Sequence, residues 1–462
     1  MTGPQPRRVL TLFDVVLFNV VVIFSVRGMT TAARMGPVSI VLWALAVGAF
    51  FVPLGLAVAE MGTRDPGQGG FYRWTRDGVG EAAGFLAGWF YWVSNLTYLP
   101  SLLIFLASAT AYAVGMPELS ENALFSAVFA LAVLWLVAWL GIRGLSLGRL
   151  VTNAGAAASW LAALLLIVAG ALVWSRSGSA TSWSWNAVRT ASGDYSTLAY
   201  FGTLSFALVG LELAPLMGGE IREPRRTIPR AIFIAGAIVA VLYVAGTIAI
   251  LAALRPEEIS PLSGAFGAVS AIGERMGASF ISPIVAALVA FAVFGGVAAW
   301  LGAVARLPYA VGLDRFLPPS MAVLHPDHGT PVNAILLQTV LTSIFIMASQ
   351  AGSTVREAYL VLVDMTIILN FIPFIFLFIA LPRLRPAGEE PGVVRIPGGR
   401  PGLVLASVLG LLATVLTLIT AVVPPPDVAS ALQFELKLWG GLLGFGVAGY
   451  LLYWRYQSHQ LT

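Results

Sequence analysis

The sequence contains no cysteine and only three histidines, His325, His328 and His459. The lack of cysteine excludes disulfide bonds and thiolate metal sites. All three histidines fall in predicted loops or in the C-terminal tail, so a Ser-His-Asp triad or a metal site inside the apolar segments has no histidine to use. The sequence therefore predicts a protein that is not an enzyme and holds no metal or other cofactor.

Charged residues are also scarce. They make up 10% of the 462 residues, whereas hydrophobic residues make up 58%, a balance outside the range of ordinary soluble domains. A helix needs about 20 apolar residues to cross a bilayer, and the ~10-residue alternation of a membrane β-barrel is absent. Twelve apolar stretches fit the first requirement: 11–34, 38–61, 83–113, 122–141, 146–174, 196–218, 230–254, 281–312, 331–349, 357–381, 402–423 and 436–454. We predict an all-α membrane protein with twelve transmembrane helices.

Positive charges are unevenly distributed over the predicted loops. If the N-terminus is cytoplasmic, the inside loops and adjoining span ends contain 18 of the 26 Lys and Arg residues, the outside loops and span ends contain 7, and Arg27 alone is left inside the membrane. This asymmetry follows the positive-inside rule and predicts a multi-pass protein of the cytoplasmic (inner) membrane with both termini cytoplasmic. It also accounts for the net charge of +4 without nucleic acid as a partner. No cleavage site follows the first span, which we expect to stay in the mature protein.

The first and sixth spans carry glycine and charge at mid-depth. The first contains Arg27 and Gly28 within "SVRGM", and the sixth contains Gly210, Glu212 and Pro215 within "FALVGLELAP". Glycine and proline weaken helices, and two interrupted helices at corresponding places in two halves indicate the central site of a transporter. The alternative is that these glycines are helix-packing contacts.

The spacing of the two interrupted spans predicts how the chain is divided. Five helices in 1–175 form a first repeat and five in 176–382 form a second, inverted repeat. Residues 383–462 add two helices and a cytoplasmic tail. The long third and eighth spans occupy equivalent places in the two halves, which supports this division.

Three motifs resemble those of the amino acid, polyamine and organocation permease superfamily. Residues 206–230, "FALVGLELAPLMGGEIREPRRTIPR", resemble its sixth-helix signature, and "PLGLAVAEMGTRDPGQGGFYRW" is similar to its helix two and the loop that follows. The segments "GLDRFLP" and "GTPVNAI" are similar to its passage from helix eight to helix nine. Within the superfamily, "VPLGLAVAEM" looks closest to the glutamate:GABA exchanger branch.

This resemblance implies two inverted five-helix repeats and an amino-acid-like substrate bound between helices one and six. Free amides of an unwound segment in helix one, Ile23 to Gly28, would face the substrate carboxylate, and free carbonyls of a second unwound segment in helix six, Phe206 to Glu212, would face its amine. The substrate-binding candidates are Ile23, Phe24, Ser25, Val26, Arg27 and Gly28 in helix one, Phe206, Val209 and Gly210 in helix six, Asn95 with Tyr98 in helix three, and Trp300 in helix eight. Phe206 would be an aromatic gate over the site, and Trp300 would close its cytoplasmic side.

The sequence departs from the superfamily pattern at two places. Many relatives have G-S-G or G-x-G in helix one, whereas this chain has Ser25-Val26-Arg27-Gly28, which predicts a less open amide cradle and altered carboxylate recognition. Helix five, "NAGAAASWLAALLL", has no lysine where some proton- or cation-linked relatives place one. We therefore expect no lysine-based coupling.

Ionisable residues inside a membrane are costly, and each needs a partner or a function. Arg27 either binds the substrate carboxylate through its planar fork or forms an ion pair with Glu212 or Asp364. We predict that it exchanges the acid for the substrate on loading. Glu212 and Asp364 are candidates for proton coupling or gating, with structural ties or a solvated cavity lining as the alternatives. Asp14 is a candidate for an intracellular gate with a loop arginine, or simply a charge at a helix N-terminus.

Together these features predict a secondary active transporter of amino acids or related amines, working by alternating access with exchange or proton coupling. Arg27 favours a neutral or acidic amino acid, and a polyamine or organocation permease is the alternative. A channel or a membrane-embedded enzyme is a remote alternative, because neither a filter motif nor a nucleophile–base pair is found. The expected partners are the substrate, the lipid bilayer and protons, and the sequence predicts no oligomeric state.

Overall fold

The computed structural model describes residues 8–67, 69–185, 188, 195–260, 264–275, 277–313, 317–350, 354–385, 391–424 and 430–460. Within these residues the fold is helical, and the only strand-like pairing is an isolated bridge between Leu10 and Ile221. Residues 314–316 of the "GLDRFLP" motif lie outside the described residues.

The helices of the N-terminal part are α1 (Leu12–Ile23), α2 (Val26–Ala33), α3 (Val38–Ala46), a π-helical turn η1 (Val47–Phe51), α4 (Val52–Arg64), α5 (Phe71–Val79), α6 (Glu81–Ala113), η2 (Pro117–Glu121), α7 (Ala123–Ile142) and α8 (Leu145–Ser177). The middle part contains α10 (Tyr195–Ala207), α11 (Leu213–Leu216), η3 (Gly218–Glu220), α12 (Pro224–Ala253), η4 (Pro256–Glu258), α13 (Gly264–Arg275), α14 (Ile281–Val304), α15 (Arg306–Leu313) and η5 (Pro319–Ala322). The C-terminal part contains α16 (Val332–Gln350), α17 (Val355–Leu384), α18 (Gly399–Ala421) and α19 (Ala431–Gln460).

The predicted all-α membrane fold of about twelve spans is confirmed. In the described part of the chain, 11 helical segments are long and apolar enough to cross a membrane, and their bounds follow the predicted stretches closely. The predicted sixth span, 196–218, is absent from these because it is divided into α10 and the four-residue α11. The repeat boundaries at 175 and 382 stay a prediction.

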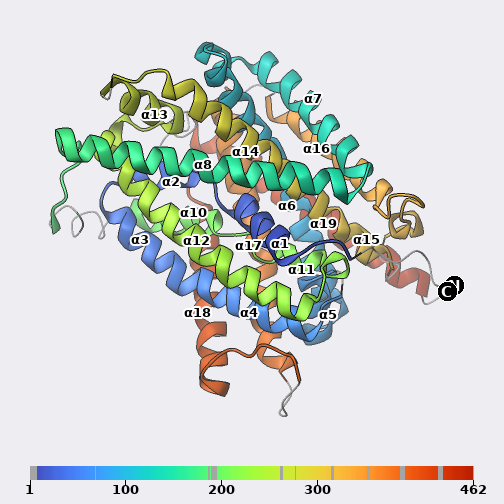
Figure 1. The fold of residues 1–462 in the computed structure, drawn as a ribbon. Coiled ribbons are helices and arrows are strands. Elements are labelled where there is room, and N and C mark those ends of the chain that lie inside the picture. The colour runs from blue at the N-terminus through green and yellow to red at the C-terminus, as the bar shows by residue number, and fades with distance from the viewer. Residues whose placement is uncertain are drawn as a thin grey trace.

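The interrupted helices lie inside the bundle. In Figure 1, α1 is seen between α8 and α12, and both of these helices pack against it. α14 packs against α8 and α6, and α17 packs against α6 and α18, so these long helices enclose α1 and α2 together with α10. Much of the large apolar side-chain surface that remains exposed lies on the outer helices, for example α18 and α19, as expected for surfaces that contact lipid.

Candidate functional site

The interruption of helix one is shorter than predicted. Only Phe24 and Ser25 separate α1 from α2, and both have extended backbone conformations. The prediction that Ile23 to Gly28 is unwound was therefore wrong at both ends, because Ile23 ends α1, and Val26, Arg27 and Gly28 form the first turn of α2. Ser25 caps that turn by accepting a hydrogen bond from the Gly28 amide at 3.2 Å, which is the usual function of serine at an N-cap.

The interruption of helix six runs from Leu208 to Glu212, whereas the prediction started two residues earlier, at Phe206. Gly210 lies at its centre with φ of 137°, a backbone conformation that favours glycine. A Cβ atom at this position would lie 2.8 Å from Cγ1 of Ile23. Gly210 therefore permits the two interruptions to approach each other closely.

Tyr243 of α12, which was not predicted from the sequence, joins the two interruptions. Its hydroxyl lies 2.6 Å from the Ile23 carbonyl and 2.9 Å from the Ala207 carbonyl, and it accepts a hydrogen bond from the Ser25 amide at 3.2 Å. Gly28 gives this ring its space, since a Cβ there would lie 2.6 Å from Cε1 of Tyr243. The available signal was a tyrosine at mid-depth in an otherwise apolar span, whose hydroxyl needs a partner when it is buried.

Several backbone groups that the resemblance assigned to a substrate already have partners in the protein. The Ser25 and Gly28 amides are bound by Tyr243 and by the Ser25 side chain. The amides of Val26 and Arg27 begin α2, where backbone N–H groups have no intrahelical acceptor. Fewer backbone amides are therefore left to bind a substrate carboxylate than the resemblance implies.

A central cavity of about 50 Å³ lies beside these interruptions, large enough for a few water molecules. Its described lining residues are Val22, Ile23, Ser25, Arg27, Gly28, Thr31, Tyr98, Thr203, Leu204, Phe206, Ala207, Val209, Trp300, Tyr359 and Val363. Eight of these residues were predicted from the sequence, whereas Tyr359, Thr31 and Thr203 were not. Trp300 also donates a hydrogen bond from Nε1 to the Val22 carbonyl at 3.1 Å, which holds the end of α1.

Four of the predicted binding residues do not line this cavity. Phe24 and Val26 instead border a smaller cavity of about 30 Å³ on the side of α14. Gly210 packs against α1. Asn95 is fully buried and donates from Nδ2 to the Tyr91 carbonyl at 2.7 Å, which ties it to its own helix.

Arg27 forms no ion pair within the described residues, so the predicted pairing with Glu212 or Asp364 was wrong for this structure. Its side chain is 9% exposed and lines the cavity, and its Nη1 is buried without a hydrogen-bond partner. Glu212 is fully buried and accepts hydrogen bonds from the Tyr91 hydroxyl at 2.7 Å and from the Gly210 amide at 3.1 Å. Asp364 has a buried Oδ2 without a partner.

Charged contacts close the end of the bundle at which α1 begins. Asp14 forms a capping box with Thr11, accepts from Asn153 Nδ2 at 2.9 Å and lies 3.7 Å from Arg149 of α8. Asp14 is thus a charge at a helix N-terminus, and its arginine partner comes from α8 and not from a loop. Its function in an intracellular gate stays a prediction. The contacts of Asp14 with Asn153 and Arg149 must break if α1 is to move away from α8.

A second charged contact at this end was missed by the sequence analysis. Glu220 of η3 and Arg306 at the start of α15 form a bidentate pair, with N–O distances of 2.7 and 2.8 Å and both side chains almost fully buried. Arg306 also donates to the Gly302 carbonyl. The pair joins the end of helix six to the end of helix eight, and removing one member would leave the other buried and uncompensated.

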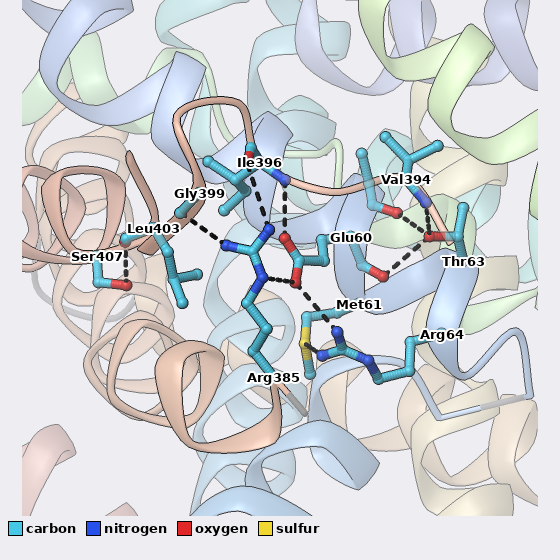
Figure 2. A network of polar contacts seen from close by, with 11 residues as sticks. Glu60, Met61, Thr63, Arg64, Arg385, Val394, Ile396, Gly399, Leu403 and Ser407 are labelled. Atoms are coloured by element: carbon cyan, nitrogen blue, oxygen red, sulfur yellow. Dashed lines mark hydrogen bonds and ion pairs between the residues drawn. The ribbon is translucent and has the colours of Figure 1, made fainter. Parts of the chain in front are cut away.

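A third polar network joins α4 to the segment between α17 and α18 (Figure 2). The fully buried Glu60 lies 3.1 Å from Arg64 and 3.4 Å from Arg385, and it accepts from the Ile396 amide at 2.9 Å. Thr63 accepts from the Val394 amide at 3.1 Å. The segment 394–396 is therefore fixed across the end of α4. Within the described residues there is no group of three acidic or histidine side chains that could hold a metal ion.

Comparison with known proteins identifies the family. A model described as "Amino acid permease" matches residues 10–446. An uncharacterized transporter of Legionella pneumophila is 27% identical over 95% of both chains. A probable agmatine/putrescine antiporter of Lactococcus lactis is 22% identical over 96% of this chain and 94% of its own length. A glutamate/gamma-aminobutyrate antiporter of the same organism is 21% identical over 89% and 82%. The predicted superfamily resemblance is confirmed: the chain belongs to the amino acid permease family and is a multi-pass membrane transporter.

Proposed function

We propose that this transporter exchanges a neutral or acidic amino acid across the cytoplasmic membrane by alternating access, as a secondary active transporter. The observation that carries the proposal is the charge of the central cavity. Arg27 is the only charged side chain among the described residues that line it. A carboxylate-bearing substrate supplies the missing counter-charge, whereas a polyamine adds a second positive charge to a site that has no acid.

The cavity offers complementary groups to both ends of an amino acid. The Arg27 guanidinium forms paired hydrogen bonds with a carboxylate, and the Val26 and Arg27 amides at the start of α2 have no intrahelical acceptor. The amine faces the rings of Phe206 and Trp300, which attract cations through their π faces. Ser25 adds a hydroxyl to the lining.

Alternating access requires contacts at the α1 end to form and break. Glu220–Arg306 and the Asp14 contacts with α8 join elements that contain the interrupted helices to α8 and α15. We assign these contacts to the cytoplasmic gate, since the proposed topology places the start of α1 in the cytoplasm. These contacts are formed in this structure, and under the proposal they shield the site from the cytoplasmic side.

Proton coupling is assigned to Glu212, with Asp364 as the second candidate. Glu212 connects α6 to the helix-six interruption through Tyr91 and Gly210, so a change in its protonation alters the hydrogen bonds that hold the interruption. Glu212→Gln is expected to abolish the pH dependence of transport while substrate-induced thermal stabilisation persists. An unchanged pH profile would transfer the assignment to Asp364 or exclude proton coupling.

The topology has a direct test, because the native chain has no cysteine. Single cysteines at Gly178, after α8, and at Arg222, between η3 and α12, are expected to react with an impermeant maleimide from opposite sides of the membrane. Labelling of both positions from outside intact cells would contradict the proposed orientation.

Exchange is tested by counterflow in proteoliposomes. Vesicles preloaded with alanine, glutamate, γ-aminobutyrate, putrescine or agmatine are exposed to the same labelled compound at trace concentration. We expect label to accumulate with at least one amino acid and with neither amine. Accumulation of putrescine or agmatine alone would support the polyamine alternative, and accumulation of none would contradict exchange of these substrates.

A further inference from the structure

The environment of Arg27 points to additional residues that determine specificity. An arginine with 9% exposure and a buried, unpartnered Nη1 would ordinarily be paired with an acid, because a buried charge without compensation is strongly unfavourable. The structure provides no such acid within the described residues. The groups that face the guanidinium are instead the side chains of two tyrosines, Tyr98 and Tyr359.

Both rings lie within the range of a cation–π contact. The Arg27 Cζ atom lies 5.8 Å from the ring centroid of Tyr98 and 5.7 Å from that of Tyr359. These distances are inside the limit of about 6 Å for an attractive contact, which strengthens when the cation is desolvated. Tyr98 comes from α6 and Tyr359 from α17, and both side chains are buried. The guanidinium is therefore held between two long helices of the surrounding bundle.

Tyr98 is itself fixed by neighbouring rings. It makes edge-on contacts with Trp300, at a centroid distance of 4.8 Å, and with Phe206, at 5.6 Å. Edge-on contacts at these distances are the preferred geometry of aromatic pairs. The ring that faces Arg27 is consequently positioned by the two aromatic residues that also line the cavity.

A ring and a carboxylate differ in one decisive respect as partners of arginine. A carboxylate cancels the positive charge, whereas a neutral ring stabilises the cation and leaves its charge in place. We propose that Tyr98 and Tyr359 are specificity-determining residues that hold Arg27 without neutralising it, so that the cavity selects substrates with a carboxylate and rejects diamines. This inference rests on the proposed function and names the substrate feature that the site requires.

The test compares variants that keep or remove the ring of Tyr359. Binding of the labelled amino acid that accumulates in counterflow is measured with purified protein, with putrescine as a competitor. Tyr359→Phe keeps the ring, and its affinity is expected to stay within about 3-fold of wild type. Tyr359→Leu removes the ring and is expected to weaken binding about 5- to 30-fold, the factor for one desolvated cation–π contact. Tyr112→Leu, on the same helix as Tyr98 but stacked on Phe266 outside the cavity, is the control with unchanged affinity.

A charge variant gives the test a second arm. Tyr359→Glu places an acid beside Arg27, and we expect it to lose amino acid binding and to let putrescine compete. Tyr98→Leu is measured in parallel, in case Tyr359→Leu does not fold, and the same 5- to 30-fold loss is expected. Wild-type affinity in a folded leucine variant, or equal losses in Tyr359→Phe and Tyr359→Leu, would overturn the inference while the proposed exchange stands. Absence of amino acid exchange by the wild type would overturn the proposed function itself.

Discussion

Tyr243→Phe tests whether one hydroxyl group holds the two interrupted helices together. The substitution keeps the ring, which stacks on Trp43 at a centroid distance of 4.4 Å and contacts Phe24 at 5.2 Å. It removes only the oxygen that lies between the carbonyls of Ile23 and Ala207 and the Ser25 amide.

The expected cost follows from counting hydrogen bonds. The phenol hydroxyl has one hydrogen, so Tyr243 donates to one carbonyl at a time and accepts from the Ser25 amide. Its loss leaves one acceptor and one donor unpaired, at about 1–3 kcal/mol for each buried group. Because the Ser25 contact is only part-buried, we expect Tyr243→Phe to lower the free energy of unfolding by about 2–4 kcal/mol. Substrate affinity should fall as well, since the hydroxyl orients the half-helix that carries Arg27.

Thermal unfolding in detergent and equilibrium substrate binding are the assays. Tyr309→Phe is the matched control, because its hydroxyl makes no hydrogen bond within the described residues and the substitution removes the same atom. A Tyr243→Phe protein with the midpoint and substrate affinity of the control would refute the assignment of Tyr243 as the link between the interruptions.

Three further predictions concern stability. Glu220→Gln leaves Arg306 buried without a counter-charge and should lower the free energy of unfolding by about 3–5 kcal/mol, which thermal unfolding would detect as a lower midpoint. Glu220→Asp should recover part of the loss. A wild-type midpoint for Glu220→Gln would contradict the stabilising function of the Glu220–Arg306 pair. Glu60→Gln removes the shared partner of two arginines and should destabilise more than Arg64→Gln, which keeps one of the pairs; equal midpoints would show that the network is not cooperative. Gly28→Ala places a methyl group 2.6 Å from a tyrosine ring carbon and should lower the midpoint more than Gly267→Ala, whose Cβ meets open space; equal effects would show that the ring moves freely.

The lengths of the apolar stretches determine most of the fold, and most of the fold was therefore predictable from the sequence. A bilayer sets the number of apolar residues per span, so the long helices could be placed to within a few residues. The exception was helix six. It was correctly expected to be interrupted, but its two separate parts are too short to be found by apolar length alone. The π-helical turn at Val47–Phe51 and the helix α5 (Phe71–Val79) were not predicted, because neither is specified by apolar periodicity.

The candidate site was predictable only in part, for a physical reason. Glycine and charge within an apolar span identify local interruptions, so Arg27, Gly28 and Gly210 could be found from their own surroundings. The partners of these residues come from helices far away in the sequence. Tyr243 and Tyr359 act through contacts that only the folded bundle creates, and a lone tyrosine in a span has many other uses.

The predicted ion pair of Arg27 illustrates the same limit. Charge complementarity suggested Glu212 or Asp364 as the partner of Arg27, since these two acids were predicted to lie at mid-membrane. The structure instead satisfies Glu212 with a tyrosine hydroxyl and a backbone amide, and it surrounds Arg27 with rings. Counting opposite charges in a sequence does not account for neutral partners.

The central claim is that Arg27 binds the substrate carboxylate, and a cycle that changes both partners tests it most directly. Dissociation constants are measured for wild type and Arg27→Ala with the amino acid that accumulates in counterflow and with its carboxamide, which lacks the charge. A charge-assisted hydrogen bond contributes about 1.5–3 kcal/mol, so Arg27→Ala should weaken amino acid binding about 10- to 150-fold and leave carboxamide binding nearly unchanged. Equal effects on both compounds, or wild-type affinity in Arg27→Ala, would contradict the account.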